Sequence, residues 1–154
     1  MKASKLLKII QEDLKKYPIN YLKNKVTDER YIDPLIKKLA EYNSNIYYEI
    51  YECEIEDDYE ISNDVVKNIR NDIGYYFDKY APTEFDEKKL TTNLTLYLAL
   101  IAKKPLHPFS EDKNDDVFFF NGTYYCKGKI KYIKDYRSLC RYCSCKTLGY
   151  QGMF

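Results

Sequence analysis

The sequence predicts a mainly α-helical protein with a small β element near its C-terminus. Through most of residues 1–104, apolar residues recur every three to four positions, which is the spacing of amphipathic helices. Within this region, residues 85–104 become apolar nearly all round, so we expect a helical bundle built around this central helix. Beyond Pro105 the pattern changes to aromatic runs around an Asn-Gly pair. We therefore divide the chain into a bundle, residues 1–104, and a Cys-rich hairpin–helix module, residues 105–154, packed on it as one domain.

Composition fits a single globular domain and excludes some classes of partner. Of the 154 residues, 45% are hydrophobic and 32% are charged, which allows a modest core. The net charge is +1, so no overall field attracts nucleic acid or a membrane. No apolar run approaches the roughly 20 residues of a membrane helix, and charges interrupt the apolar residues of residues 1–18. We expect a cytoplasmic protein that does not bind membranes.

The first half of the chain is expected to form two helices. Ser4 is expected to cap the first, which ends near Pro18. Its apolar stripe consists of Leu6, Ile9, Ile10 and Leu14. After a short polar stretch, Asp33 and Pro34 start another helix, because proline at the first helical position loses no hydrogen bond. Its expected buried face contains Leu35, Leu39 and Tyr42. Residues 43–60 fit a helix through apolar pairs four apart, or a strand through alternation with glutamates, and we favour the helix.

Two further helices are expected before the module. The first begins at Asn63 and is broken at residues 81–83. Its apolar positions are Val66, Ile69, Ile73, Tyr76 and Phe77. Thr83 and Asp86 resemble a capping box for the central helix. The apolar second half of that helix contains Leu94, Leu96, Leu98, Leu100 and Ile101.

The module is expected to contain a hairpin followed by a helix. Asn121 and Gly122 separate two aromatic, β-prone runs, which is a strong short-range signal for a hairpin turn. Asp135 is expected to cap a last short helix that stops at Gly149. Leu139, Cys140 and Cys143 would lie on this helix.

Four of the five cysteines gather in the module, which indicates a bound metal. Cys126 ends the hairpin, and Cys140 and Cys143 share one face of the expected helix because residues three apart are neighbours. Cys145 would point to the opposite side of that helix. We therefore expect His107, held between two prolines, as the fourth ligand of a structural zinc ion coordinated by His107, Cys126, Cys140 and Cys143.

Other readings of these residues stay open. The four clustered thiols could hold an iron–sulfur cluster in a redox or sensing protein, or they could be unliganded or form a disulfide. His107 could be a simple loop residue, and Cys53 is expected in the core. A metal-dependent enzyme would need an open coordination position and a general base, for which the sequence offers Glu111, Asp112, Asp115 and Asp116. No catalytic motif is present, so no catalytic residue, substrate or reaction is assigned.

The order of motifs in the module also resembles a known family. A His-Pro pair precedes the pattern Asn-Gly-x-Tyr-Tyr-Cys, a lysine-rich spacer and Leu-Cys-x-x-Cys. This order is similar to the C-terminal signature of an uncharacterised family found mainly in methanogenic archaea, domain of unknown function 2115. The matching positions are His107, Pro108, Tyr124, Tyr125, Cys126, Leu139, Cys140 and Cys143. The acidic residues 110–117 depart from the glycine-rich stretch of family members. The resemblance implies an archaeal, cytoplasmic setting and no particular activity.

The spacer between the cysteines is basic and aromatic, which suggests a macromolecular partner. Its cations are Lys127, Lys129, Lys131, Lys134, Arg137 and Arg141, and they alternate with Tyr132, Tyr136 and Tyr142. Such a surface could hold single-stranded nucleic acid, with cations on phosphates and rings on bases. Alternatively, it pairs with the acidic residues 52–60 inside the folded protein. We expect an interaction module with a structural metal. The sequence does not specify its partner or its oligomeric state.

Overall fold

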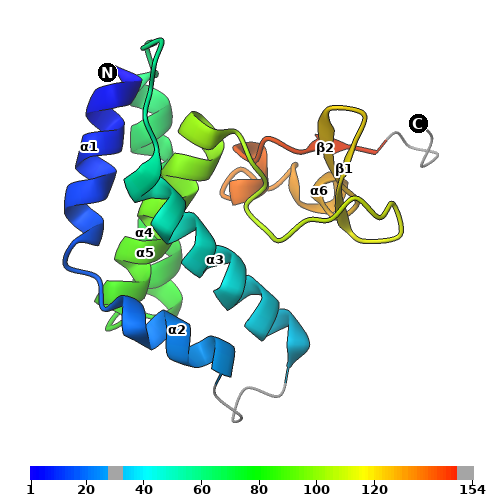
Figure 1. Cartoon of the computed structure of the whole chain (residues 1–154), viewed down its shortest axis with the longest axis horizontal. Helices are drawn as coiled ribbons and strands as arrows, with labels where there is room; N and C mark the ends of the chain where they lie inside the picture. The colour runs from blue at the N-terminus through cyan, green and yellow to red at the C-terminus, as the bar shows by residue number, and fades with distance from the viewer. Residues whose placement is uncertain (28–32, 149–154) are drawn as a thin grey trace.

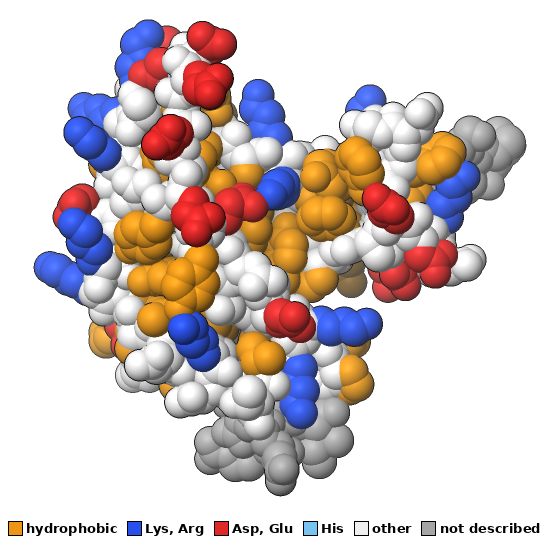
Figure 2. All heavy atoms as spheres, in the orientation of Figure 1, with side chains coloured by type: hydrophobic (Ala, Val, Ile, Leu, Met, Phe, Trp, Pro, Cys, Tyr) orange, Lys and Arg blue, Asp and Glu red, His pale blue; other side chains and the backbone are white. Residues whose placement is uncertain are grey.

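A computed structural model describes residues 1–27 and 33–148 and is mainly helical, as predicted. The helices are α1 (Ala3–Leu14), α2 (Ile19–Thr27), α3 (Pro34–Glu52), α4 (Asn63–Tyr80), α5 (Phe85–Leu96) and α6 (Lys129–Tyr132). A π-helix, η1 (Tyr97–Ala102), continues α5, and a 3-10 turn, η2 (Leu139–Arg141), lies near the end of the chain. The strands β1 (Val117–Phe120), β2 (Thr123–Cys126) and β3 (Lys146–Thr147) form one sheet in the order β1-β2-β3. Figure 1 shows the sheet and its turns beside the helical bundle, and Figure 2 shows hydrophobic side chains gathered on this face where the two parts meet.

The helix formed by α5 and η1 lies at the centre of the bundle. α5 packs against α1, α3 and α4, and η1 also contacts α1. α2 packs mainly against α3 and lies at one end of the bundle (Figure 1). The predicted central position of residues 85–104 is therefore confirmed, although the sequence did not predict that the second half of this helix adopts the wider π form.

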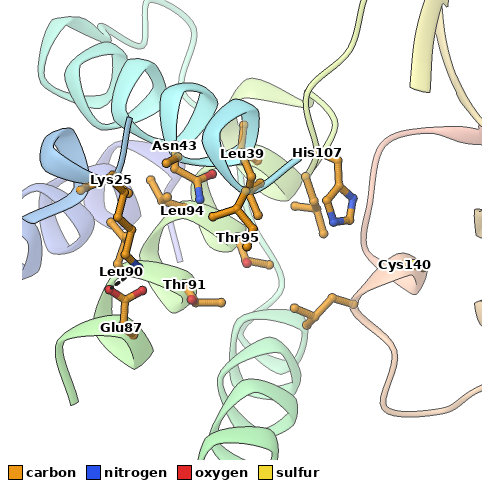
Figure 3. Close-up of a pocket in the computed structure, with 16 residues that line it drawn as sticks. Lys25, Leu39, Asn43, Glu87, Leu90, Thr91, Leu94, Thr95, His107 and Cys140 are labelled. Carbon is orange, nitrogen blue, oxygen red and sulfur yellow. Dashed lines mark ion pairs between the residues drawn. The ribbon is translucent and has the colours of Figure 1, made fainter. Parts of the chain in front are cut away.

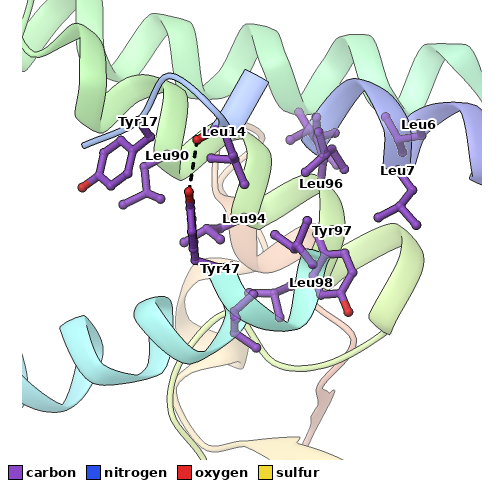
Figure 4. Close-up of a cluster of buried hydrophobic side chains, with 14 of the residues drawn as sticks. Leu6, Leu7, Leu14, Tyr17, Tyr47, Leu90, Leu94, Leu96, Tyr97 and Leu98 are labelled. Atoms are coloured by element: carbon purple, nitrogen blue, oxygen red, sulfur yellow. Dashed lines mark hydrogen bonds between the residues drawn. The ribbon is translucent and has the colours of Figure 1, made fainter. Parts of the chain in front are cut away.

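The core of the bundle consists of aliphatic side chains from all the long helices. Its most deeply buried members are Leu6, Ile10, Leu14, Ile50, Ile69, Ile73, Leu96 and Leu98. In Figure 4, the leucines of α5 and η1 lie between α1 and α3, and the Tyr47 hydroxyl donates to the Leu14 carbonyl at 3.4 Å. Each fully buried leucine or isoleucine contributes about 1.5–3 kcal/mol to stability, so this core holds the bundle together.

The π-helix is anchored where the chain leaves the bundle. The Tyr97 hydroxyl donates to Glu49 Oε2 at 2.7 Å, and Lys104 Nζ lies 2.5 Å from Glu49 Oε1. Burial, together with the Glu49 carboxylate, raises the pKa of Tyr97 well above its usual value. The helix ends at Lys103, whose φ of 54° reverses the chain. These contacts to α3 set the direction in which the module begins.

Two predicted helix caps are wrong. Ser4 lies inside α1 and does not cap it, because its hydroxyl donates to the Asp58 carboxylate instead. The N-cap of α5 is Glu84, without a side-chain cap bond, so Thr83 and Asp86 do not form the expected capping box. The error at Ser4 arose because a local sequence pattern cannot show that a distant carboxylate, Asp58, takes the hydroxyl.

The extent of α3 was predicted better than its buried face. The helix begins at Pro34 with Asp33 as its cap and continues through residues 43–52, which confirms the predicted helix there. Residues 53–60 are not helical, so the second part of that prediction is wrong. Leu35 is 74% exposed and Leu39 is 36% exposed, so they do not form the expected buried face. The buried residues of α3 are Ala40, Ser44, Ile46, Tyr47 and Ile50. α3 packs mainly against α2, a helix that occupies part of the expected polar stretch.

α4 begins one residue after its cap, Ser62, whose side chain accepts from the Val65 N–H. Its core positions Val66, Ile69 and Ile73 are buried as predicted. Tyr76 is 56% exposed, so its predicted place on the apolar face is wrong.

The hairpin is confirmed, with Phe119 opposite Tyr124 in the antiparallel pair β1-β2. Asn121 and Gly122 both have positive φ, at 51° and 82°, as a two-residue hairpin turn of this twist requires. Phe118 is fully buried and its ring stacks on Tyr125, with centroids 5.5 Å apart. The hairpin therefore has a small apolar centre of its own.

The helix predicted after Asp135 is wrong. Residues 129–132 form α6 instead, and only residues 139–141 turn as a 3-10 helix, capped by the Ser138 side chain. The chain then passes a turn at Tyr142 and a bend at Ser144, and it pairs in parallel with β2 as β3. The predicted stop at Gly149 lies outside the described residues. Within residues 1–27 and 33–148, no helix has both the length and the apolar character required to cross a membrane.

Candidate metal centre

Three short segments bring the four module cysteines into one region. Cys126 is the last residue of β2, and Cys140 lies in η2. Cys143 and Cys145 precede β3, where Thr147 pairs with Cys126. The parallel pairing of β2 and β3 therefore returns the end of the chain to the strand that carries Cys126.

The thiols of Cys143 and Cys145 shift each other's pKa in opposite directions. Interaction with the Cys145 thiol, together with the backbone N–H groups of Cys145 and Leu106, lowers the pKa of Cys143. Interaction with Cys143 and burial raise the pKa of Cys145, which is only 2% exposed. The surroundings therefore favour the thiolate at Cys143.

Cys126 is surrounded by backbone donors. Burial raises the pKa of its thiol, while the N–H groups of Gly128 and Lys129 donate to the sulfur and oppose that rise. The thiolate charges of Cys143 and Cys140 raise it further, which places all three sulfurs within electrostatic range of one another. Cys145 is likewise affected by both Cys143 and Cys126. Backbone N–H groups that converge on sulfur favour the charged thiolate, the form that binds metals.

Lys129 is buried beneath the cysteine segment. Its Nζ donates to the carbonyls of Cys143, at 2.7 Å, and Cys145, at 2.6 Å. Its positive charge also lowers the pKa of both thiols. The sequence placed Lys129 among the cations of a phosphate-binding face, and this assignment is wrong because the ammonium is enclosed by the protein. Nothing in the lysine-rich spacer distinguishes Lys129 from its neighbours, so no local signal could have revealed its role.

His107 lies beside a cavity at the boundary between the module and the bundle. Its side chain is exposed and, with Cys140, lines a space of about 340 Å³ between α3, α5 and the module. In Figure 3 the two residues enter this space from different chain segments, while Leu39, Leu90 and Leu94 form part of its apolar wall. The residue before His107, Leu106, donates its N–H to Cys143. The structure therefore places Cys140 and Cys143 of the predicted set within electrostatic range of Cys126, and Cys145 is influenced by Cys143 and Cys126.

No metal-binding arrangement is preformed in the part of the chain that the structure describes. There, no three His, Cys, Asp or Glu side chains are positioned together to hold an ion. The loop carboxylates considered as general bases, Glu111, Asp112, Asp115 and Asp116, are exposed. Asp115 accepts from the Ser110 hydroxyl at 2.5 Å and Asp112 accepts from the Asn114 N–H at 2.9 Å, so both stabilise their own loop. Cys53, which lies beyond the end of α3, packs partly buried against the bundle core as expected.

The region of the thiols is tied to the bundle on two sides. The Tyr42 hydroxyl from α3 donates to the Pro105 carbonyl at 2.5 Å. On the other side, Asp72 of α4 accepts from the Arg141 guanidinium and from the Tyr142 hydroxyl, each at 2.8 Å. The segment of residues 140–145, which we call the cysteine turn, therefore lies between α3 and α4 of the bundle and not at the free end of the module.

Comparison with known proteins supports the family resemblance of the module and extends it upstream. Residues 2–148 match a family described as an uncharacterized protein conserved in archaea (DUF2115). The chain is also 34% identical over 141 residues to the UPF0305 protein MJ0646 of Methanocaldococcus jannaschii, covering 90% of this chain and 80% of that protein. No solved structure matches the chain. Because the match spans both the bundle and the cysteine turn, the chain belongs to this conserved archaeal family, DUF2115.

Proposed function

We propose that the module is an interaction module fastened to the bundle by one structural zinc ion. Its ligands would be Cys126, Cys140, Cys143 and Cys145. Cys145 replaces His107 in this set. On a helix Cys145 would point away from Cys143, but residues 142–145 are not helical. The observation that carries the proposal is the parallel pairing of β3 with β2, which returns the segment of Cys143 and Cys145 to the strand that ends in Cys126.

The chemistry of these groups suits a soft divalent cation. Binding would release the protons that these thiols carry, since metal ligands must be deprotonated. Four thiolates around Zn²⁺ carry a net charge of −2, and the buried ammonium of Lys129 would offset part of it. A sphere filled by four protein ligands leaves no position for a catalytic water, so this site would be structural.

Such an ion would stabilise a segment that has little core of its own. In the described part of the module, the fully buried large side chains are Phe118 and Pro105. Metal binding can supply folding free energy that such a small apolar centre does not provide. Because Leu106 donates to Cys143 and Tyr42 bonds to Pro105, the ion would also fix the module on α3. The cavity of about 340 Å³ between the module and the bundle would then stay open to a partner.

Metal analysis of anaerobically purified protein tests the proposal. We expect one zinc ion per chain and no visible colour; brown protein containing iron would instead support an iron–sulfur cluster on the same thiols. Zinc in excess, at about 1,000 times its dissociation constant, should stabilise the metal-free protein by about 4 kcal/mol. This corresponds to a rise in melting temperature of about 8–16 °C for a chain of this size.

Matched variants identify the ligands. Cys145→Ser should lose stoichiometric zinc, whereas His107→Ala and Cys53→Ser should retain it. Loss of zinc in His107→Ala with retention in Cys145→Ser would restore the set first predicted from the sequence. Metal-free protein whose melting temperature does not respond to zinc would refute the proposal.

A further inference from the structure

A second, larger cavity lies on the α4 side of the module. It measures about 720 Å³ and is formed where residues 135–139 pass beside α4. Its wall is rich in aromatic rings: Tyr75, Tyr76, Phe77 and Tyr80 come from α4, and Tyr136 comes from the module. We call this the tyrosine groove. It depends on the module being docked, so it exists only where the cysteine turn is held against the bundle.

The rings of the tyrosine groove are unusually open to solvent. Tyr75 is 42% exposed, Tyr76 56%, Tyr80 63% and Tyr136 70%. Tyr76 and Tyr80 lie one helical turn apart, with ring centroids separated by 5.2 Å. Single exposed aromatic residues are ordinary, but four that line one concavity mark a binding surface. Rings that are this exposed are suited to stacking on another planar ring.

Cations lie against these rings. The Arg137 guanidinium carbon is 3.7 Å from the centroid of Tyr75, and Lys79 Nζ is 5.3 Å from that of Tyr80. Within residues 1–27 and 33–148, neither cation forms an ion pair with a carboxylate, whereas Asp72 is engaged by Arg141. Two carboxylates also line the groove: Asp72 pairs with Arg141, and Asp135 accepts the backbone N–H of Arg137 at 3.0 Å. The side chains of Arg137 and, next to the groove, Lys79 are therefore the cations that could meet a phosphate.

We propose that the tyrosine groove binds single-stranded nucleic acid. Unpaired bases would stack on Tyr76, Tyr80 and Tyr136, and the phosphates would contact Lys79 and Arg137. This combination of aromatic platforms and cations is how proteins hold unpaired strands with little sequence preference. A duplex would not fit, because its bases are already stacked on each other.

The openness of the groove favours a strand over a free nucleotide. Sites for small molecules bury most of the ligand surface, whereas here the rings are spread along α4 and across to the module. A strand gains from several modest stacking contacts in succession, which a single nucleotide cannot make. The proposal names the partner of the interaction module and rests on the docked state described above. It moves the site from the lysine-rich spacer to the groove beside α4.

Fluorescence anisotropy with a labelled 12-nucleotide single-stranded RNA tests this proposal on the full chain. We expect binding in 50 mM salt that weakens roughly sevenfold in 200 mM salt, as two phosphate contacts on a single strand predict. Tyr80→Ala and Tyr136→Ala should each weaken binding about tenfold, the typical effect of removing one stacking ring. Both side chains are largely exposed, so neither change should alter the melting temperature by more than a degree or two.

The matched control is Tyr132→Ala. Tyr132 is 57% exposed on α6 and lies outside the groove, so its removal should leave RNA affinity unchanged. The groove proposal is overturned if Tyr132→Ala weakens binding as much as Tyr136→Ala, if a free mononucleotide binds as tightly as the RNA, or if no RNA binds at 50 mM salt. Zinc content measured on the same samples separates the two proposals. Protein with zinc but without RNA affinity refutes only the groove, and metal-free protein that binds RNA refutes only the zinc site.

Discussion

Replacing Lys129 by methionine tests whether the buried ammonium strengthens zinc binding by the thiolates. Lys129 is 8% exposed, and its Nζ donates to the carbonyls of Cys143 and Cys145 at 2.7 and 2.6 Å. Methionine fills similar space but removes the charge and both donors. A unit charge at about 6 Å from a thiolate, in a medium of effective dielectric constant 20, interacts by about 3 kcal/mol. That value corresponds to about a hundredfold in affinity, and supporting groups around metal ligands typically contribute 10–100-fold.

We therefore expect Lys129→Met to weaken zinc binding 10–100-fold. The measurement is competition between metal-free protein and a chromophoric chelator, with circular dichroism to verify the fold. Lys131→Met is the control, because Lys131 lies on the same short helix but is exposed. If the two variants bind zinc with affinities within threefold of each other, the electrostatic role assigned to Lys129 is wrong.

Two further predictions concern the bundle. Leu96→Ala should destabilise the protein by about 2–5 kcal/mol, because Leu96 is fully buried. Leu35→Ala should destabilise it by less than about 0.5 kcal/mol, because Leu35 is 74% exposed. Equal losses of unfolding free energy in urea would contradict this description of the core. The Ser4 hydroxyl donates to the Asp58 carboxylate and lowers the pKa of Asp58 in the folded protein. The contact therefore stabilises the fold at pH values above the unfolded-state pKa of about 3.9. This stabilisation is lost as the pH falls through the lower pKa of the folded state. Ser4→Ala should therefore be more destabilised relative to the natural chain at pH 6 than at pH 2. Urea midpoints whose difference is the same at both pH values would rule out this linkage.

Local patterns predicted the elements whose causes are local. The turn at Asn121 and Gly122 depends on two residues that tolerate positive φ, and residues 85–104 have an apolar surface that only a central position can cover. By contrast, α2 has only one buried residue, Leu22, so its amphipathic signal is weak. It forms because α3 offers a surface for it, a fact that no window of the sequence contains.

The candidate site was predicted in its residue types but not in its geometry. The concentration of cysteines was evident, yet the assumed helix assigned Cys145 to the wrong side. The actual course of residues 142–147 is set by pairing with β2, a contact between segments about 20 residues apart. The burial of Lys129 has the same origin, because the carbonyls that receive it belong to that returning segment. Such long-range contacts are not encoded in local spacing.

The parallel pairing of β2 with β3 has a consequence for the order of assembly. A hairpin such as β1-β2 closes within microseconds, because its strands are adjacent in the chain. Lys146 must instead find Tyr125 across an intervening loop of about 20 residues, at an entropic cost of roughly 2.7 kcal/mol plus a constant. The hairpin should consequently exist first as a template, and the cysteine pair before β3 should reach Cys126 only in the last step, so that maturation of this region is slower than collapse of the bundle.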